Sequence, residues 1–176
     1  PVSLLELEAA LRLKRDRQGD KLFGREEALT LIRLWQKRGE RVVFTNGCFD
    51  LLHTGHVKLL HAAAKEGDKL VVGINSDESV QRLKGTGRPV LPEKERAAML
   101  SAIGGVDMVV LFTEDTPLEL IAAVKPEVLV KGGDYTPETV VGGDIVKEYG
   151  GKVCLVPLKE GFSTTNIINS VKHQDD

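Results

Sequence analysis

The sequence has few of the features that mark secreted, membrane or nucleic-acid-binding proteins. Its 176 residues include only two cysteines, far apart in the chain, so no disulfide framework is expected. No apolar run approaches the roughly 18 residues that a membrane-spanning helix needs. The formal net charge of −2 offers no broad basic surface for nucleic acid or an anionic membrane. We therefore expect a cytoplasmic protein without a nucleic-acid or membrane partner.

Aromatic residues are also scarce, with one Trp, two Tyr and five Phe, but the hydrophobic content of 41% is ordinary for a globular domain. Continuous apolar runs predict buried strands at 41–45, 69–74, 108–112, 128–130 and 153–156. Helical segments separate these runs. Strands that alternate with helices predict an α/β fold with a doubly wound, mostly parallel sheet of five or six strands, covered on both faces.

The first 39 residues are predicted to form a helical arm ahead of a domain at 40–176. Ser3 and Glu6 make a capping box, which predicts a helix to about residue 14. A second helix is predicted at 25–38 by one apolar stripe. The stripe consists of Ala28, Leu31, Ile32 and Trp35. We expect the arm to pack on the domain or on a second subunit.

The most informative stretch is 42–56, where an apolar strand runs through a small-residue turn into the start of a helix. His53 and His56 stand three residues apart, on one face of the first helical turn, and Gly55 lets a ligand approach the backbone. The free N–H groups of a helix start carry about half a positive charge, so phosphate is a natural ligand. Zinc would need three or four ligands, and neither cysteine has a typical metal spacing. The stretch predicts a phosphate site.

Residues 46–56 resemble the His-x-Gly-His signature of the cytidylyltransferase-like nucleotidyltransferases. The runs 44–56 and 161–166 are most similar to the adenylyltransferases that activate heptose 1-phosphate, and the resemblance covers about residues 40–172. It implies a Rossmann-like fold and transfer of AMP from ATP to D-glycero-β-D-manno-heptose 1-phosphate. It also implies Mg²⁺ as the partner of ATP, with no dedicated protein metal site.

The same resemblance suggests which residues form the site. The catalytic residues would be His53, His56 and Lys84. The nucleotide-binding residues would be Asn46, Gly47, Cys48, Phe49, Gly55, Arg96, Lys131, Gly132, Asp134, Tyr135, Ser163 and Thr164. Plainer interpretations stay open for some of them: a solvated surface lysine, a helix salt bridge for Arg96, a simple turn at 131–135 and ordinary helix caps at 163–164. Asp50 is expected to orient the turn.

Other functions share these motifs. Cytidylyltransferases for glycerol 3-phosphate or for ethanolamine or choline phosphate, and the pantetheine phosphate adenylyltransferases, also contain His-x-Gly-His. From a different class, the chain could be a non-catalytic nucleotide-binding module that docks a sugar kinase. The expected partners are ATP and a sugar phosphate, with a homo-oligomer and a separate sugar kinase of the same pathway left open.

Overall fold

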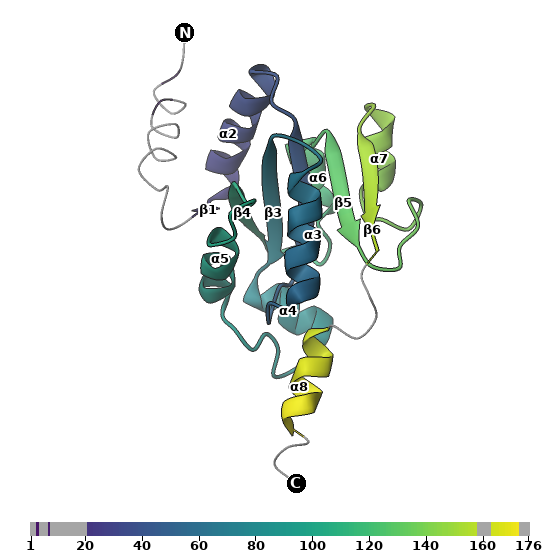
Figure 1. The fold of residues 1–176 in the computed structure, drawn as a ribbon. Coiled ribbons are helices and arrows are strands. Elements are labelled where there is room, and N and C mark those ends of the chain that lie inside the picture. Colours follow the sequence, from purple (N-terminus) through teal and green to yellow (C-terminus); the bar gives the residue numbers. More distant parts are fainter. Residues whose placement is uncertain (1–2, 4–6, 8–20, 158–162, 173–176) are drawn as a thin grey trace.

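A computed structural model describes residues 3, 7, 21–157 and 163–172. The six strands are β1 Leu22–Phe23, β2 Val42–Gly47, β3 Lys69–Asn75, β4 Met108–Phe112, β5 Val128–Gly132 and β6 Lys152–Val156. The helices are α2 Arg25–Lys37, α3 Thr54–Ala64, α4 Asp77–Lys84, α5 Glu93–Ser101, α6 Leu118–Val124, α7 Gly143–Glu148 and α8 Thr164–Lys172. All strand pairs are parallel, in the order β1-β4-β3-β2-β5-β6 (Figure 1). The predicted doubly wound α/β fold is confirmed.

Helices cover both faces of this sheet. One hydrophobic cluster joins α2, α6 and α7 to one face, and a second joins α3 and α5 to the other. Successive strand residues point to opposite faces, so Phe44 enters the first cluster and Val43 the second. Burial on both faces explains why the strands read as unbroken apolar runs. Among the described residues, no helix has the length and apolar character needed to cross a membrane.

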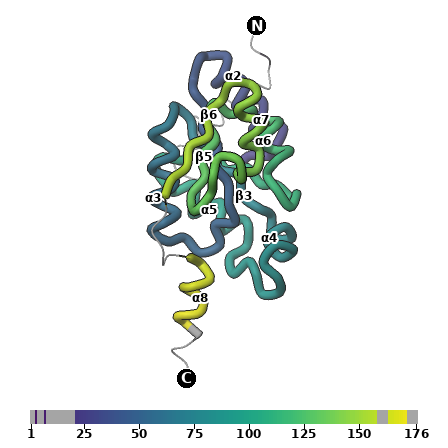
Figure 2. The backbone as a smooth tube through the Cα atoms, turned by 90° about the vertical axis from the view of Figure 1, so that its right-hand side faces the viewer, coloured from purple at the N-terminus to yellow at the C-terminus, as the bar shows by residue number. Residues whose placement is uncertain are grey.

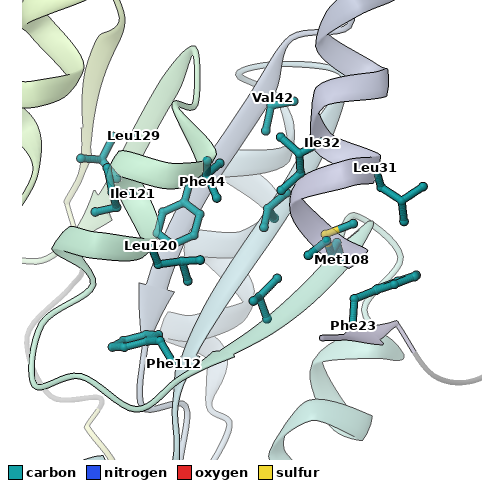
Figure 3. Close-up of a cluster of buried hydrophobic side chains, with 14 of the residues drawn as sticks. Phe23, Leu31, Ile32, Val42, Phe44, Met108, Phe112, Leu120, Ile121 and Leu129 are labelled. Atoms are coloured by element: carbon teal, nitrogen blue, oxygen red, sulfur yellow. The ribbon is translucent and has the colours of Figure 1, made fainter. Parts of the chain in front are cut away.

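Phe44 is one of the largest fully buried apolar side chains of the first cluster. It is fully buried and lies beside Leu120 and Ile121 of α6 (Figure 3). On the neighbouring strand, a Cβ at Gly73 would come within 2.7 Å of the Phe44 ring. The glycine therefore makes room for the ring, and close packing at this point fixes β2 against α6.

The N-terminal part differs in detail from the sequence prediction. The helix predicted at 25–38 is α2, and its predicted stripe is buried in the first cluster. Before it lies the two-residue strand β1, which pairs with Val109 and Val110 of β4 and was not predicted. Most of the helix predicted from residue 3 lies outside the described residues. The division of the chain after residue 39 stays a prediction.

The carboxyl edge of the sheet contains a topological switch point. From β2 the chain proceeds to β3 and β4 on one side, then returns to β5 and β6 on the other side. In parallel sheets, ligands bind in the crevice outside the strand ends where this reversal occurs. Helix α8 extends from the same end of the molecule in both views (Figures 1 and 2). The segments predicted to form the site therefore meet at this edge.

Candidate active site

The turn after β2 is held by an unusual backbone conformation at Phe49. Its φ of 47° lies in the left-handed region, which is rare for a bulky residue. The Phe49 side chain is buried, and its ring centroid lies 5.1 Å from that of His56. A Cβ at Gly47 would stand 3.1 Å from this ring. The ring therefore fits between Gly47 and the histidine, and two predicted nucleotide-binding residues shape the turn itself.

The two motif histidines stack at the start of α3. His53 is the N-cap residue, and its ring centroid lies 3.7 Å from that of His56, with an angle of 24° between the planes. The His53 backbone N–H donates to Nδ1 of His56 at 3.3 Å. In the neutral ring the proton of His56 is then on Nε2, which is the nitrogen left to donate to a ligand. Gly55 lies between them in the first helical turn.

Burial keeps this histidine pair uncharged. It lowers the pKa of His53, and burial together with the nearby His53 lowers the pKa of His56 to about 4. His53 Nδ1 is buried and has no hydrogen-bond partner among the described residues. At neutral pH both rings are therefore neutral hydrogen-bonding groups, and a bound anion would favour their protonation.

Asp50 joins the turn to the loop before α5. Its buried carboxylate accepts hydrogen bonds from Arg88 Nε at 2.7 Å, from Val90 N at 2.8 Å and from Leu91 N at 3.0 Å. Although burial acts to raise the pKa of Asp50, these hydrogen bonds lower it. The expected orienting role of Asp50 is confirmed. Arg88, which binds Asp50, was not predicted as a site residue, although the sequence shows that it lies in a Gly-rich basic loop.

Arg96 lies beneath the turn, with a side chain that is fully buried. Its donors reach Leu91 O at 3.0 Å, Cys48 O at 2.7 Å, Asn75 O at 2.8 Å and Asp77 Oδ1 at 2.7 Å. Four of the five N–H groups of the guanidinium thus bind protein oxygens. The geometry makes Arg96 a residue that positions the turn, and a direct contact with nucleotide stays a prediction.

Cys48 lies where several positive charges gather. Its half-buried thiol approaches Asn75 Oδ1 at 3.7 Å. Burial raises the pKa of the thiol, while the positive charges of Lys84, Arg96 and Arg88 act in the opposite direction. Lys84 is the last residue of α4 and is exposed, rather than part of the flexible loop in which it was expected. Arg96 and Arg88 are paired with Asp77 and Asp50, so Lys84 is the cation near the turn that has no carboxylate partner among the described residues.

On the other side of β2, the end of β5 brings Lys131 to the same edge. Its ammonium donates to the backbone O of Asn46 at 3.3 Å and to Oδ1 of Asn46 at 3.4 Å. The Tyr135 ring centroid lies 5.6 Å from this ammonium. Gly132 ends the strand, while Asp134 and Tyr135 are exposed in the loop that follows. The predicted nucleotide loop thus lies directly beside the predicted turn.

The start of α8 also reaches the turn. Thr164 donates its hydroxyl hydrogen to Leu51 O at 3.2 Å, and Ser163 Oγ accepts from Asn166 N at 3.1 Å as a helix cap. The two hydroxyls therefore lie at a helix N-terminus near the histidine pair, as the sequence predicted. Gly161 and Phe162 lie outside the described residues. Asn75, at the end of β3, was not predicted as a site residue. It contacts Cys48 and Arg96, which lie in distant parts of the sequence.

Comparison with known proteins agrees with this arrangement. The model of the family described as "Cytidylyltransferase-like" matches residues 44–170. The chain is 54% identical over 170 residues to the "Bifunctional protein HldE" of Trichlorobacter lovleyi, a match that covers 97% of this chain and 35% of that protein. It is 58% identical over 147 residues to the protein of the same name from Gluconobacter oxydans, covering 84% of this chain and 31% of that protein. The chain thus spans about a third of the length of these curated relatives.

A solved structure shows the same fold at lower identity. It is described as "the lipopolysaccharide core biosynthesis protein from Thermoplasma volcanium GSS1". The TM-score is 0.56 with 27% identity, and the match covers 70% of this chain and 100% of that one. The family match covers most of the chain, and the relatives extend beyond it. The chain belongs to the cytidylyltransferase-like family and is a nucleotidyltransferase.

Proposed function

We propose that the chain transfers AMP from ATP to D-glycero-β-D-manno-heptose 1-phosphate, giving ADP-heptose and pyrophosphate. The observation that carries the proposal is the stacked His53 and His56 pair at the start of α3, set at the carboxyl edge of a parallel sheet. The choice of heptose rests on the resemblance to heptose 1-phosphate adenylyltransferases. The Thermoplasma protein is described as a lipopolysaccharide core biosynthesis protein, which supports the same substrate class.

The chemistry is an in-line substitution at phosphorus. An oxygen of the sugar phosphate forms a bond to the α-phosphorus of ATP, while the bond to the bridging oxygen of the β-phosphate breaks and pyrophosphate leaves with that electron pair. The second pKa of a phosphate monoester is about 6, so the attacking oxygen already carries its charge at neutral pH. The protein therefore needs no general base, and catalysis consists of positioning and electrostatic stabilisation.

The site residues divide this work among themselves. His53 and His56 donate hydrogen bonds to the triphosphate and to the charge that builds up during transfer. Lys84, at the end of α4, stays in contact with the α-phosphate during the transfer. Ser163 and Thr164 bind the β- and γ-phosphates. Tyr135, which is 44% exposed, covers the base. Arg96 and Asp50 hold the turn in place from below.

Magnesium is proposed to arrive with ATP. Among the residues that the structure describes, no group of three or more His, Cys, Asp or Glu side chains is placed to hold a metal ion. The phosphates and water would therefore supply most of its ligands, as is common for Mg²⁺. When bound, it neutralises negative charge on the triphosphate and the leaving pyrophosphate. Use of ATP also fits the proposed cytoplasmic location.

The test is a panel of pyrophosphate-release assays that crosses ATP and CTP with heptose 1-phosphate, glycerol 3-phosphate, phosphoethanolamine and phosphopantetheine. We expect the fastest turnover with ATP and the heptose, with the His53→Ala variant as the inactive control. Faster turnover with CTP and glycerol 3-phosphate would overturn the substrate pair and leave the mechanism standing. Nucleotide binding without pyrophosphate release for any acceptor would indicate a non-catalytic binding module.

The scarcity of aromatic rings disfavours a choline phosphate substrate. A quaternary ammonium is usually held by an aromatic cage. The single tryptophan, Trp35, is buried on α2 within the first cluster and contacts Lys69 at the amino end of β3, the end opposite the proposed site. A kinase activity in the same pathway, whether in a separate protein or in a longer chain, and a homo-oligomeric assembly are further proposals that the assay does not require.

A further inference from the structure

Lys131 is a half-buried cation without a carboxylate partner. No Asp or Glu among the described residues forms an ion pair with it, and its two hydrogen bonds to Asn46 are long, at 3.3 and 3.4 Å. Burial lowers the pKa of this lysine, although Cys48 acts in the opposite direction. Lysine is seldom buried unless it is paired. An anion from outside the chain would supply the missing countercharge.

The position of Lys131 is where the fold places a ligand. Lys131 and Asn46 lie at the carboxyl ends of β5 and β2, the two neighbouring strands between which the strand order reverses. Parallel sheets bind ligands outside the strand ends at this reversal. The two residues are 85 positions apart in the sequence, so only the pairing of β2 with β5 brings them together.

Strand alternation places Lys131 across the sheet from the histidines. Val130 belongs to the cluster beneath α3, and Leu129 belongs to the cluster on the opposite face. Side chains alternate along a strand, so Lys131 leaves β5 on the same side as Leu129. By the same rule, the Asn46 side chain lies on the same face of the sheet as the Phe44 side chain, two residues earlier on β2. A ligand bound at the strand ends would therefore contact α3 on one face of the sheet and Lys131 on the opposite face.

Asn46 adds a second donor at this point. A lysine ammonium can only donate, so the Asn46 atom that accepts from it is Oδ1. The Nδ2 group of Asn46 is then turned away from Lys131, and it has no hydrogen-bond partner among the described residues. One remaining ammonium hydrogen and the amide hydrogens thus form a small donor set next to the exposed Tyr135 ring.

We propose that Lys131 and Asn46 bind the α-phosphate of the nucleotide, the phosphoryl group that is transferred. The proposal rests on the proposed function, because it takes ATP as the nucleotide. Tyr135, the proposed cover of the base, lies 5.6 Å from the ammonium, so this ammonium faces the nucleoside end of the ligand. The β- and γ-phosphates lie at the start of α8 in the proposed arrangement. The cation of β5 therefore stabilises charge at the reacting phosphorus from the side opposite the histidine pair.

The test compares ligands that differ only in their phosphates. The affinities of wild-type protein and of Lys131→Met for adenosine, AMP, ATP and pyrophosphate are measured by NMR titration, which detects millimolar binding. Loss of one charge-assisted hydrogen bond should weaken AMP and ATP about 10- to 100-fold. Adenosine and pyrophosphate should bind as before. Lys125→Met is the matched control, because Lys125 is exposed just before β5, at the opposite edge of the sheet, and should change nothing.

Each other result overturns the proposal in a recognisable way. Equal weakening of adenosine and AMP would assign Lys131 to the base, and weakening of pyrophosphate would assign it to the β- and γ-phosphates. Unchanged AMP affinity with a lower melting temperature would make Lys131 structural. If wild-type protein binds no adenine nucleotide, the proposed function fails first and this inference falls with it. Asn46→Ala should reproduce the AMP loss with a smaller fold-change.

Discussion

Replacing Arg96 with methionine removes the guanidinium that joins four segments under the candidate site. Three backbone carbonyls, those of Cys48, Asn75 and Leu91, lose their hydrogen-bond donor, and Asp77 loses its ion pair. A buried acceptor without a donor costs about 1–3 kcal/mol. Breaking one side of a buried charged network typically costs about 3–5 kcal/mol. We therefore expect Arg96→Met to lower the free energy of unfolding by about 3–5 kcal/mol.

This loss is large against the roughly 5–15 kcal/mol that stabilises a typical domain. Urea denaturation followed by circular dichroism measures it directly, and an unchanged m-value would show that the denatured state is the same. Arg82→Met is the control, because Arg82 pairs with Asp115 at the surface, where both side chains are about half exposed or more. Such a pair contributes about 0–1 kcal/mol. Arg96→Lys should fall between the two variants, since lysine keeps the charge but not the planar fork.

If Arg96→Met folds with less than about 1 kcal/mol of lost stability, the four hydrogen bonds do not hold the turn as we infer. Abolished turnover in such a stable variant would instead support the direct nucleotide contact that the sequence suggested. Loss of both stability and turnover, restored in part by lysine, would support the positioning role.

Three further outcomes are expected. Replacing His53 or His56 with Ala should lower turnover about 100-fold or more, as loss of a preorganised donor does, and near-normal turnover in both variants would contradict their assigned role. The double change Ser163→Ala and Thr164→Ala should raise KM for ATP and leave KM for the sugar phosphate little changed, and the opposite pattern would move α8 to the acceptor. The pKa of His56 is lowered from 6.5 to about 4 in the folded state. Between pH 6.5 and pH 4, the unfolded state therefore binds more protons than the folded state. The free energy of unfolding should therefore fall as the pH falls through that window, and it should fall by less in His56→Gln than in wild type. Urea denaturation at several pH values would measure both changes.

Several features could be predicted from local sequence because their physical cause is local. The strands from β2 to β6 are continuous apolar runs, since a parallel strand is buried on both faces, and the runs are visible without any structure. The spacing of His53, Gly55 and His56 predicted that both histidines stand at the beginning of an apolar helix, because three residues make about one helical turn, and α3 confirms that placement. The order of strands and helices was then enough to predict a doubly wound sheet with its ligand edge.

The contacts that tie the site together depended on the tertiary structure. Asp50 meets Arg88 across 38 residues, Arg96 meets Cys48 across 48, and Lys131 meets Asn46 across 85. A single sequence shows that these polar residues exist, but not which of them the crossovers bring within hydrogen-bond distance. Burial decides their roles: the same arginine is a ligand contact when exposed and a support for the turn when enclosed.

The two-residue strand β1 gives the same lesson for secondary structure. Leu22 and Phe23 are too few to show a period of two, so no local pattern distinguishes them from a loop. They become a strand only because β4 offers Val109 and Val110 at the sheet edge. The sequence by itself determined the elements with a repeating pattern and the motif at a helix start. Only the tertiary structure decided the short edge strand and the long-range partners, because both depend on which distant segments pack side by side.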